Sequence, residues 1–174
     1  MVMNSSSLDV IFDDERWEQK LPNIDAFAND VFDKAIEFLT VNELGFEGWN
    51  HKPVSISLSL SNNIEVQKLN REFRGKDKPT NVLSFANIDD EAFEEEFLNC
   101  DVVELGNIIM AMETLEDEAK IKNISLPNHF AHLLIHGILH LFGYDHIDDD
   151  EADEMEGIEI DILKELNIAN PYEE

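Results

Sequence analysis

One segment near residue 140 constrains the fold more than any other part of the chain, because it spaces three histidines around a predicted helix end. His136 and His140 are four residues apart. On an α-helix this is roughly 40° of rotation and about 6 Å of rise, so both rings can reach one ion. Gly143 stands where this helix should end, since glycine adopts the left-handed conformation that turns a chain back. The turn returns His146 toward the first two rings.

Three imidazoles in this arrangement are typical of a catalytic zinc site. Three neutral nitrogens leave the fourth tetrahedral position of Zn²⁺ open for water, whereas a structural site is closed by a fourth protein ligand. We therefore predict one zinc ion per chain on His136, His140 and His146. His132 continues the same helical stripe, but it lies about 12 Å from His140 along the axis. We expect His132 to pack nearby or to support a ligand from behind.

The residue after the first histidine distinguishes this motif from that of a zinc protease. The spacing H-x-x-x-H-x-x-G-x-x-H is that of the metzincin proteases, in which a glutamate after the first histidine is the general base. Here that position is Gly137, which has no side chain to move a proton. The pattern therefore predicts a metallohydrolase that does not use the usual route of peptide hydrolysis.

Length and composition favour a single folded domain spanning residues 1–174. Hydrophobic residues make up 43% of the 174 residues, which is sufficient for a substantial core. The one cysteine, Cys100, has no partner for an internal disulfide, as expected in a reducing compartment. The first residues lack the basic and apolar regions of a signal peptide, and no run approaches the roughly 20 apolar residues of a membrane span. We expect a cytoplasmic protein.

The distribution of charge is more informative than its total. A net charge of −27 argues at first against a nucleic-acid partner, because phosphate binding depends on Lys and Arg. Five of the twelve basic residues, however, fall within eleven positions: Lys68, Arg71, Arg74, Lys76 and Lys78. This basic island is interpreted either as a localised anion site or as a solvated loop.

Hydrophobic periodicity predicts an α+β domain with a mixed four-stranded sheet packed against about five helices. The expected strands are 8–12, 54–60, 81–85 and 105–110, and the expected helices are 24–39, one starting at Asn62 or Asn63, 113–122, 127–142 and 149–166. The acidic stretch 89–104 is expected to be an irregular connection, either a solvated loop or a lid.

Three stretches resemble the YbeY family of bacterial endoribonucleases and ribosomal RNA maturation factors. The resemblance runs from about residue 55 to residue 166 and lies in the segments 74–85, 105–110 and 131–146, with Glu151-Ala and Met155-Glu beyond them. The two longer segments, 74–85 and 131–146, are highly specific. It implies a zincin-like fold with zinc on the three histidines. It also implies cleavage of single-stranded RNA in 3′-end maturation of 16S ribosomal RNA and in ribosome quality control, with the small ribosomal subunit and assembly proteins as partners.

The functional arginine of the family falls on Arg74, and the resemblance assigns Arg74 and His136 to catalysis. Two positions depart from the usual family pattern. Asn107 stands where an aspartate that could support the site is usual, and Ala86 stands where proline is usual. We expect neither DNA nor a membrane as a partner.

Zinc and the basic island together suit phosphoryl chemistry, because zinc activates water and an arginine fork can hold two phosphate oxygens. We predict that Arg74 clamps the reacting phosphate and that further basic residues bind the RNA: Arg71, Lys76 and Lys78. Asp145 could orient a ligand histidine, act as a base or serve only as a turn residue. The alternatives are a zinc-stabilised ribosome-assembly factor without catalysis and, less favoured, a metalloprotease.

Overall fold

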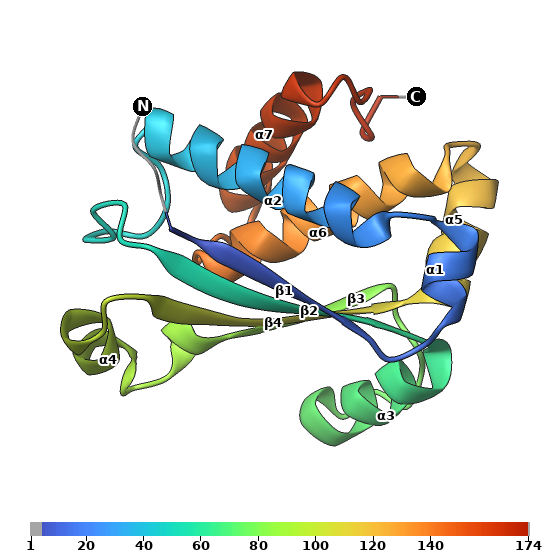
Figure 1. The fold of residues 1–174 in the computed structure, drawn as a ribbon, viewed down its shortest axis with the longest axis horizontal. Coiled ribbons are helices and arrows are strands. Elements are labelled where there is room, and N and C mark those ends of the chain that lie inside the picture. The colour runs from blue at the N-terminus through green and yellow to red at the C-terminus, as the bar shows by residue number, and fades with distance from the viewer. Residues whose placement is uncertain (1–4, 174) are drawn as a thin grey trace.

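The computed structural model describes residues 5–173, in which four strands form one mixed sheet. The strand order is β1-β2-β4-β3 (Figure 1). β1 (Ser7–Phe12), β2 (Val54–Ser61) and β4 (Val103–Ala111) are parallel neighbours, and β3 (Val82–Ala86) pairs antiparallel with β4. β3 is therefore an edge strand with one side open to other parts of the chain.

The helices lie unequally on the two faces of this sheet. In Figure 1, α2 (Ile24–Val41), α6 (Leu126–Leu141) and α7 (Asp149–Glu165) cover one face, and α3 (Asn63–Arg74) lies on the other. The described residues also form α1 (Arg16–Lys20), α4 (Phe93–Asn99), α5 (Met112–Lys122) and a short 3-10 helix, Asn87–Asp89. No helix in this part of the chain is long and apolar enough to cross a membrane.

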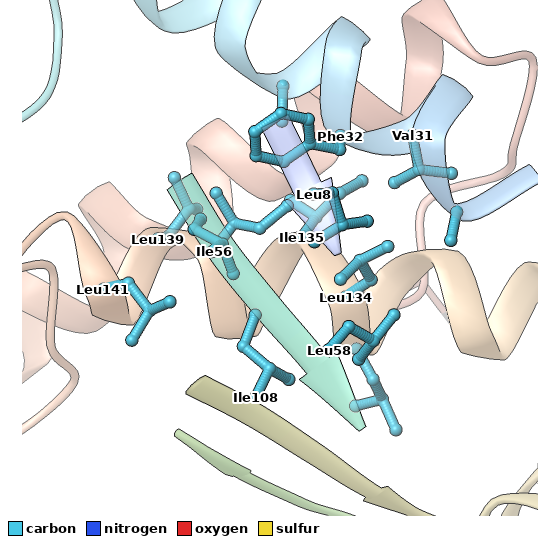
Figure 2. Packing of buried hydrophobic residues seen from close by; sticks show 14 of the residues in the cluster. Leu8, Val31, Phe32, Ile56, Leu58, Ile108, Leu134, Ile135, Leu139 and Leu141 are labelled. Atoms are coloured by element: carbon cyan, nitrogen blue, oxygen red, sulfur yellow. The ribbon is translucent and has the colours of Figure 1, made fainter. Parts of the chain in front are cut away.

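The core lies between the sheet and α2, with α6 buried in the middle. Alternate residues of β2 point into it, as the serine-interrupted pattern of that strand predicts. Figure 2 shows Ile56 and Leu58 of β2 with Ile135 and Leu139 of α6 and Phe32 of α2. Burying side chains of this size contributes about 1.5–3 kcal/mol each. The helix that carries the first two site histidines is therefore held firmly in place.

The predicted α+β class and four-stranded mixed sheet are confirmed, but the structure has seven α-helices within residues 5–173 rather than about five. The five-residue α1 depends on Trp17, which is fully buried and donates its indole N–H to the Ser61 carbonyl oxygen at 2.8 Å. Such a short helix is stabilised by tertiary contacts that periodicity does not reveal.

The expectation of an irregular connection over residues 89–104 is wrong, because part of this stretch is helical. It contains α4, whose Phe93 is buried and packs edge-on against Phe46 with ring centroids 5.6 Å apart. Phe97 of the same helix also contacts Phe46, at 5.5 Å. These aromatic contacts fix the segment to the core, which does not support the interpretation as a free lid.

Candidate metal centre

The end of α6 has the helix-to-turn geometry that the sequence predicts. The helix begins after Ser125, whose hydroxyl accepts the Asn128 backbone N–H at 3.2 Å, and its last residue is Leu141. Gly143 follows with φ of 99°, a left-handed conformation that glycine adopts without strain. The Tyr144 N–H then donates to the Leu139 carbonyl oxygen at 3.0 Å, which closes the turn.

The turn brings the three predicted histidines together. His136, His140 and His146 each offer one ring nitrogen, and these atoms all lie within 4.8 Å of one another. The ring centroids are 4.5 Å apart for His136 and His140, 5.5 Å for His136 and His146, and 5.1 Å for His140 and His146. The first two rings are partly buried and the third is exposed, so the cluster opens toward solvent on the side of His146.

Hydrogen bonds fix which nitrogen of two of these rings carries the proton. His140 Nδ1 lies 2.9 Å from the Tyr144 carbonyl oxygen. A carbonyl can only accept, so Nδ1 is the protonated nitrogen and Nε2 keeps its lone pair. His136 Nδ1 lies 3.0 Å from Glu159 Oε2. If that carboxyl is ionised, His136 also presents an unprotonated Nε2.

Glu159 is ionised because its hydrogen bonds outweigh its burial. The residue is fully buried on α7. Burial raises its pKa, but hydrogen bonds from His132 and His136 lower it more strongly and hold the pKa at about 2. His132 Nε2 donates to Glu159 Oε1 at 2.7 Å, and the Tyr172 hydroxyl donates to the same oxygen at 2.6 Å. His132 thus contacts the carboxylate that also binds His136.

The nitrogen lone pairs of the triad suit a metal ion. His136 Nε2 and His140 Nε2 lie 3.0 Å apart. Two unprotonated nitrogens at this distance repel each other unless a proton or a cation lies between them. Burial lowers the pKa of His140, which disfavours the proton. Imidazole donors suit zinc, copper, iron or nickel rather than magnesium or calcium, so the residues present could hold an ion of the first group.

A cavity of about 580 Å³ opens in front of the triad. Residues from α3, β3, the 3-10 helix, α5, α6 with the turn after it, and the segment after α7 line it, among them Arg74, Ser84, Ala86, Asp89, Lys122, His132, Asp145 and Tyr172. Two of the lining residues are cations, Arg74 and Lys122. The cavity therefore combines a potential metal site with positive charge supplied by two different helices.

Arg74, the last residue of α3, is held at the edge of the sheet beside this cavity. Its Nη2 donates to the Ser84 carbonyl oxygen of β3 at 2.9 Å, and its guanidinium lies 5.8 Å from the centroid of the Phe85 ring. Gly75 then turns the chain away with φ of 69°. These contacts fix the side chain and leave the other N–H groups of the guanidinium to bind a ligand.

The other predicted RNA-binding residues lie outside the cavity lining. Arg71 pairs instead with Asp77, at 3.5 Å, and both side chains are largely exposed. Lys76 and Lys78 are exposed on the loop after α3. The residues of the basic island lie close together in the sequence, but only one of them, Arg74, lines the cavity. Lys122, which sequence reasoning missed, reaches the cavity because α5 ends beside α6.

The expectation that position 107 supports the site is corrected by the structure, because Asn107 lies on the face of the sheet that points away from the histidines. It is exposed and shares a small hollow with Asp9, Ser57 and Glu104. Its neighbour Ile108 is buried and packs toward Gly137 of α6. Successive residues of a strand point to opposite faces, so Asn107 points away from the triad. Ala86, the second departure, lines the cavity at the end of β3.

Two further residues near the triad have identifiable structural roles. The Asp145 carboxylate accepts the His146 backbone N–H at 2.8 Å, which stabilises the turn while the residue still lines the cavity. Gly137 is buried against β4, where an added Cβ would lie 3.0 Å from Ile108 Cδ1. The position of the protease glutamate thus faces the sheet, so a side-chain base there has no room.

The same family is found when the chain is compared with known proteins. The family model described as endoribonuclease YbeY matches residues 12–167. A Francisella philomiragia protein named endoribonuclease YbeY is 42% identical over 172 residues, which covers 98% of this chain and 97% of the relative. An Agrobacterium fabrum protein of the same name is 39% identical over 170 residues, covering 98% and 96%.

A solved structure supports the fold. The solution structure of TM1509 from Thermotoga maritima aligns with a TM-score of 0.56 and covers 97% of each chain. The sequence identity is 20%, so this likeness concerns the architecture alone.

Proposed function

The chain belongs to the YbeY family of endoribonucleases, and from this premise we propose that it is a zinc-dependent enzyme that cleaves single-stranded RNA. Its role is 3′-end maturation of small-subunit ribosomal RNA and ribosome quality control in the cytoplasm, with the small subunit and its assembly proteins as partners. One observation carries the proposal: Arg74 and the three histidines line the same cavity.

His136, His140 and His146 would hold one zinc ion. When bound, zinc activates water and polarises a phosphoryl oxygen. The protein contributes the orientation of the ligands. Glu159 and the Tyr144 carbonyl oxygen accept from the Nδ1 atoms of two of the rings, so that their Nε2 lone pairs face the cavity.

Arg74 would clamp the phosphate at the scissile bond. Its planar fork can hold two oxygens at once and offset the negative charge that develops during phosphoryl transfer. The contacts to Ser84 and Phe85 support this role, because they hold the guanidinium in place before the substrate arrives. A phosphodiester is itself anionic, so it requires this cation more than a neutral peptide bond does.

Lys122 would bind a neighbouring phosphate of the same strand. It lines the cavity from α5, whereas Arg74 lines it from α3. Two cations on separate elements suit an extended polyanion that crosses the cavity past the metal. Arg71, Lys76 and Lys78 remain candidates for weaker contacts outside the cavity.

The two alternatives account for less of the site. A metalloprotease requires a general base, and the buried Gly137 leaves no room for one at the usual position. An assembly factor without catalysis explains a structural metal, but not an arginine held beside an open cavity.

One experiment separates these functions. Zinc-loaded protein is incubated with labelled single-stranded RNA, duplex RNA and casein, each with and without a chelator. We expect chelator-sensitive cleavage of the single-stranded RNA alone. Casein cleavage would support the protease, and metal binding without turnover on any substrate would support the assembly factor.

A further inference from the structure

Glu159 connects the candidate metal centre to a part of the chain outside the family match. Its Oε2 accepts from His136, and its Oε1 accepts from both His132 and the Tyr172 hydroxyl. The carboxylate is fully buried, so these three donors take the place of water around its charge. Tyr172 lies beyond residue 167, where the family match ends.

The segment 166–173 is built to present Tyr172 to this carboxylate. Asn167 takes a left-handed conformation with φ of 61°, and the Ile168 N–H donates to the Leu163 carbonyl oxygen at 2.9 Å. The Asn170 side chain accepts the Tyr172 N–H at 2.8 Å, which shapes the last turn before the hydroxyl reaches Glu159. Tyr172 is 43% exposed and lines the cavity, so its hydroxyl contacts a buried group from the rim.

We propose that Tyr172 is a positioning residue that acts through Glu159 on His136. The hydroxyl of Tyr172 and the Nε2–H of His132 hold Oε1, so the carboxylate cannot rotate and Oε2 stays on His136 Nδ1. This fixes the ring with Nε2 toward the cavity, where it would hold the zinc ion. The segment after α7 is thereby part of the metal centre, and the inference rests on the zinc site proposed above.

Coupling of this kind is reciprocal. If docking of Tyr172 tightens metal binding by some factor, metal binding must favour docking of the segment 166–173 by the same factor. The two effects can be measured independently, and neither requires RNA.

The first test measures zinc release to a chromogenic chelator from the full-length protein and three variants: Tyr172→Phe, Glu159→Gln and the double variant. We expect about ten- to a hundredfold faster release from Glu159→Gln, since loss of a partner behind a ligand histidine typically weakens binding this much. Tyr172→Phe should release zinc several-fold faster than the wild type. In the Glu159→Gln background it should add little, because the two residues act in series.

The control is Glu118→Gln. Glu118 of α5 accepts at 2.9 Å from the buried His129 of α6, the helix that carries His136 and His140, but it contacts no proposed ligand. This variant should match the wild type in zinc release even where its thermal stability falls. A general loosening of α6 would instead accelerate release in all variants.

The second test measures hydrogen exchange of residues 166–173 in the metal-free and zinc-loaded protein. We expect zinc to slow exchange in the wild type and to have a smaller effect in Tyr172→Phe. The inference is overturned if zinc release from Tyr172→Phe equals that of the wild type, or if zinc leaves exchange in this segment unchanged. A wild-type protein that binds no metal would overturn the proposed function instead.

Discussion

The three proposed ligand histidines differ in how firmly the fold holds them. His136 and His140 lie on a buried helix, and each has a hydrogen-bond partner at Nδ1. His146 is exposed in the turn, where its backbone N–H donates to Asp145. The first two rings are therefore preorganised, and the third would complete the proposed site from an exposed position.

Replacing any of the three by alanine should sharply lower bound zinc, as measured by elemental analysis after dialysis. His132→Ala should retain most of it, because His132 contacts Glu159 and does not belong to the proposed set of ligands. Full zinc content in His146→Ala would show that the ligand set is different.

Arg74→Ala should keep the fold and the zinc but lose RNA cleavage by on the order of a hundredfold or more, as loss of a charge partner in the transition state commonly does. Arg74→Lys is the matched control, since it keeps the charge and loses the fork. Partial activity would indicate a purely electrostatic contribution, and near-complete loss would indicate bidentate contact. Wild-type cleavage by Arg74→Ala would contradict a role in the site.

Lys122→Ala should weaken RNA binding more than Lys76→Ala, although Lys76 belongs to the basic island and Lys122 does not. The reason is position: Lys122 lines the cavity and Lys76 does not. Binding measured at several salt concentrations should show a salt slope about one unit shallower for Lys122→Ala, as expected for one lost phosphate contact. Equal effects of the two variants would place the RNA outside the cavity.

At the scale of elements, the contact between α6 and β4 determines where the site lies. α6 packs closely on the sheet because Gly137 has no side chain, so Ile108 can fill the space in front of it. The same contact excludes a protease-type glutamate. Packing and chemistry are therefore coupled at this position.

Gly137→Ala and Gly157→Ala form a matched pair for this contact. Both changes gain up to about 1 kcal/mol of helix propensity, but a Cβ at Gly157 meets nothing within 4 Å, whereas one at Gly137 lies 3.0 Å from Ile108. In urea unfolding, Gly157→Ala should be stabilising and Gly137→Ala clearly less so or destabilising. Adding Ile108→Val to Gly137→Ala should recover part of the difference in the free energy of unfolding between the two variants. Equal stabilisation by both alanines would mean that Ile108 accommodates the added Cβ at no cost.

At the scale of the whole molecule, protonation and metal binding oppose each other. Burial is the main cause that lowers the pKa of His129 and of His140 below the usual value of about 6.5. As the pH falls through that value, the unfolded chain takes up protons before the folded chain does. The contribution of these two histidines to the stability of the metal-free protein is therefore fully present above about pH 6.5 and is lost as the pH falls below that value.

The metal-free protein should thus have a lower free energy of unfolding at pH 5.5 than at pH 7.5, as measured by urea denaturation. His129→Gln should reduce this pH dependence without touching a proposed ligand. Zinc at a hundred times its dissociation constant should add about 2.7 kcal/mol at the higher pH, and less at the lower pH because protons compete for the ring nitrogens. Stability that does not change with pH would contradict the burial of neutral histidines.

The sequence by itself determined the parts of this protein that depend on local spacing. The interval from His136 to His146, the turn at Gly143 and the alternation along β2 each follow from the geometry of one helix, one turn or one strand. The mixed sheet and the α+β class follow from the order of such elements. The family resemblance added Arg74, which is one member of a basic island whose other members the sequence could not rank.

Only the tertiary structure decided which distant side chains meet. Glu159 reaches His136 across 23 positions and Tyr172 reaches His132 across 40 positions, distances over which no periodicity operates. The sequence contains one signal for Glu159, which is that a carboxylate occupies a position in the buried stripe of α7. Lys122 enters the cavity and Lys76 does not because of how α5 and α3 approach β3 and α6. The sequence analysis placed Asn107 near the histidines, which is wrong. The alternation along a strand shows which residues share a face, but only the folded sheet shows which of its two faces lies against α6.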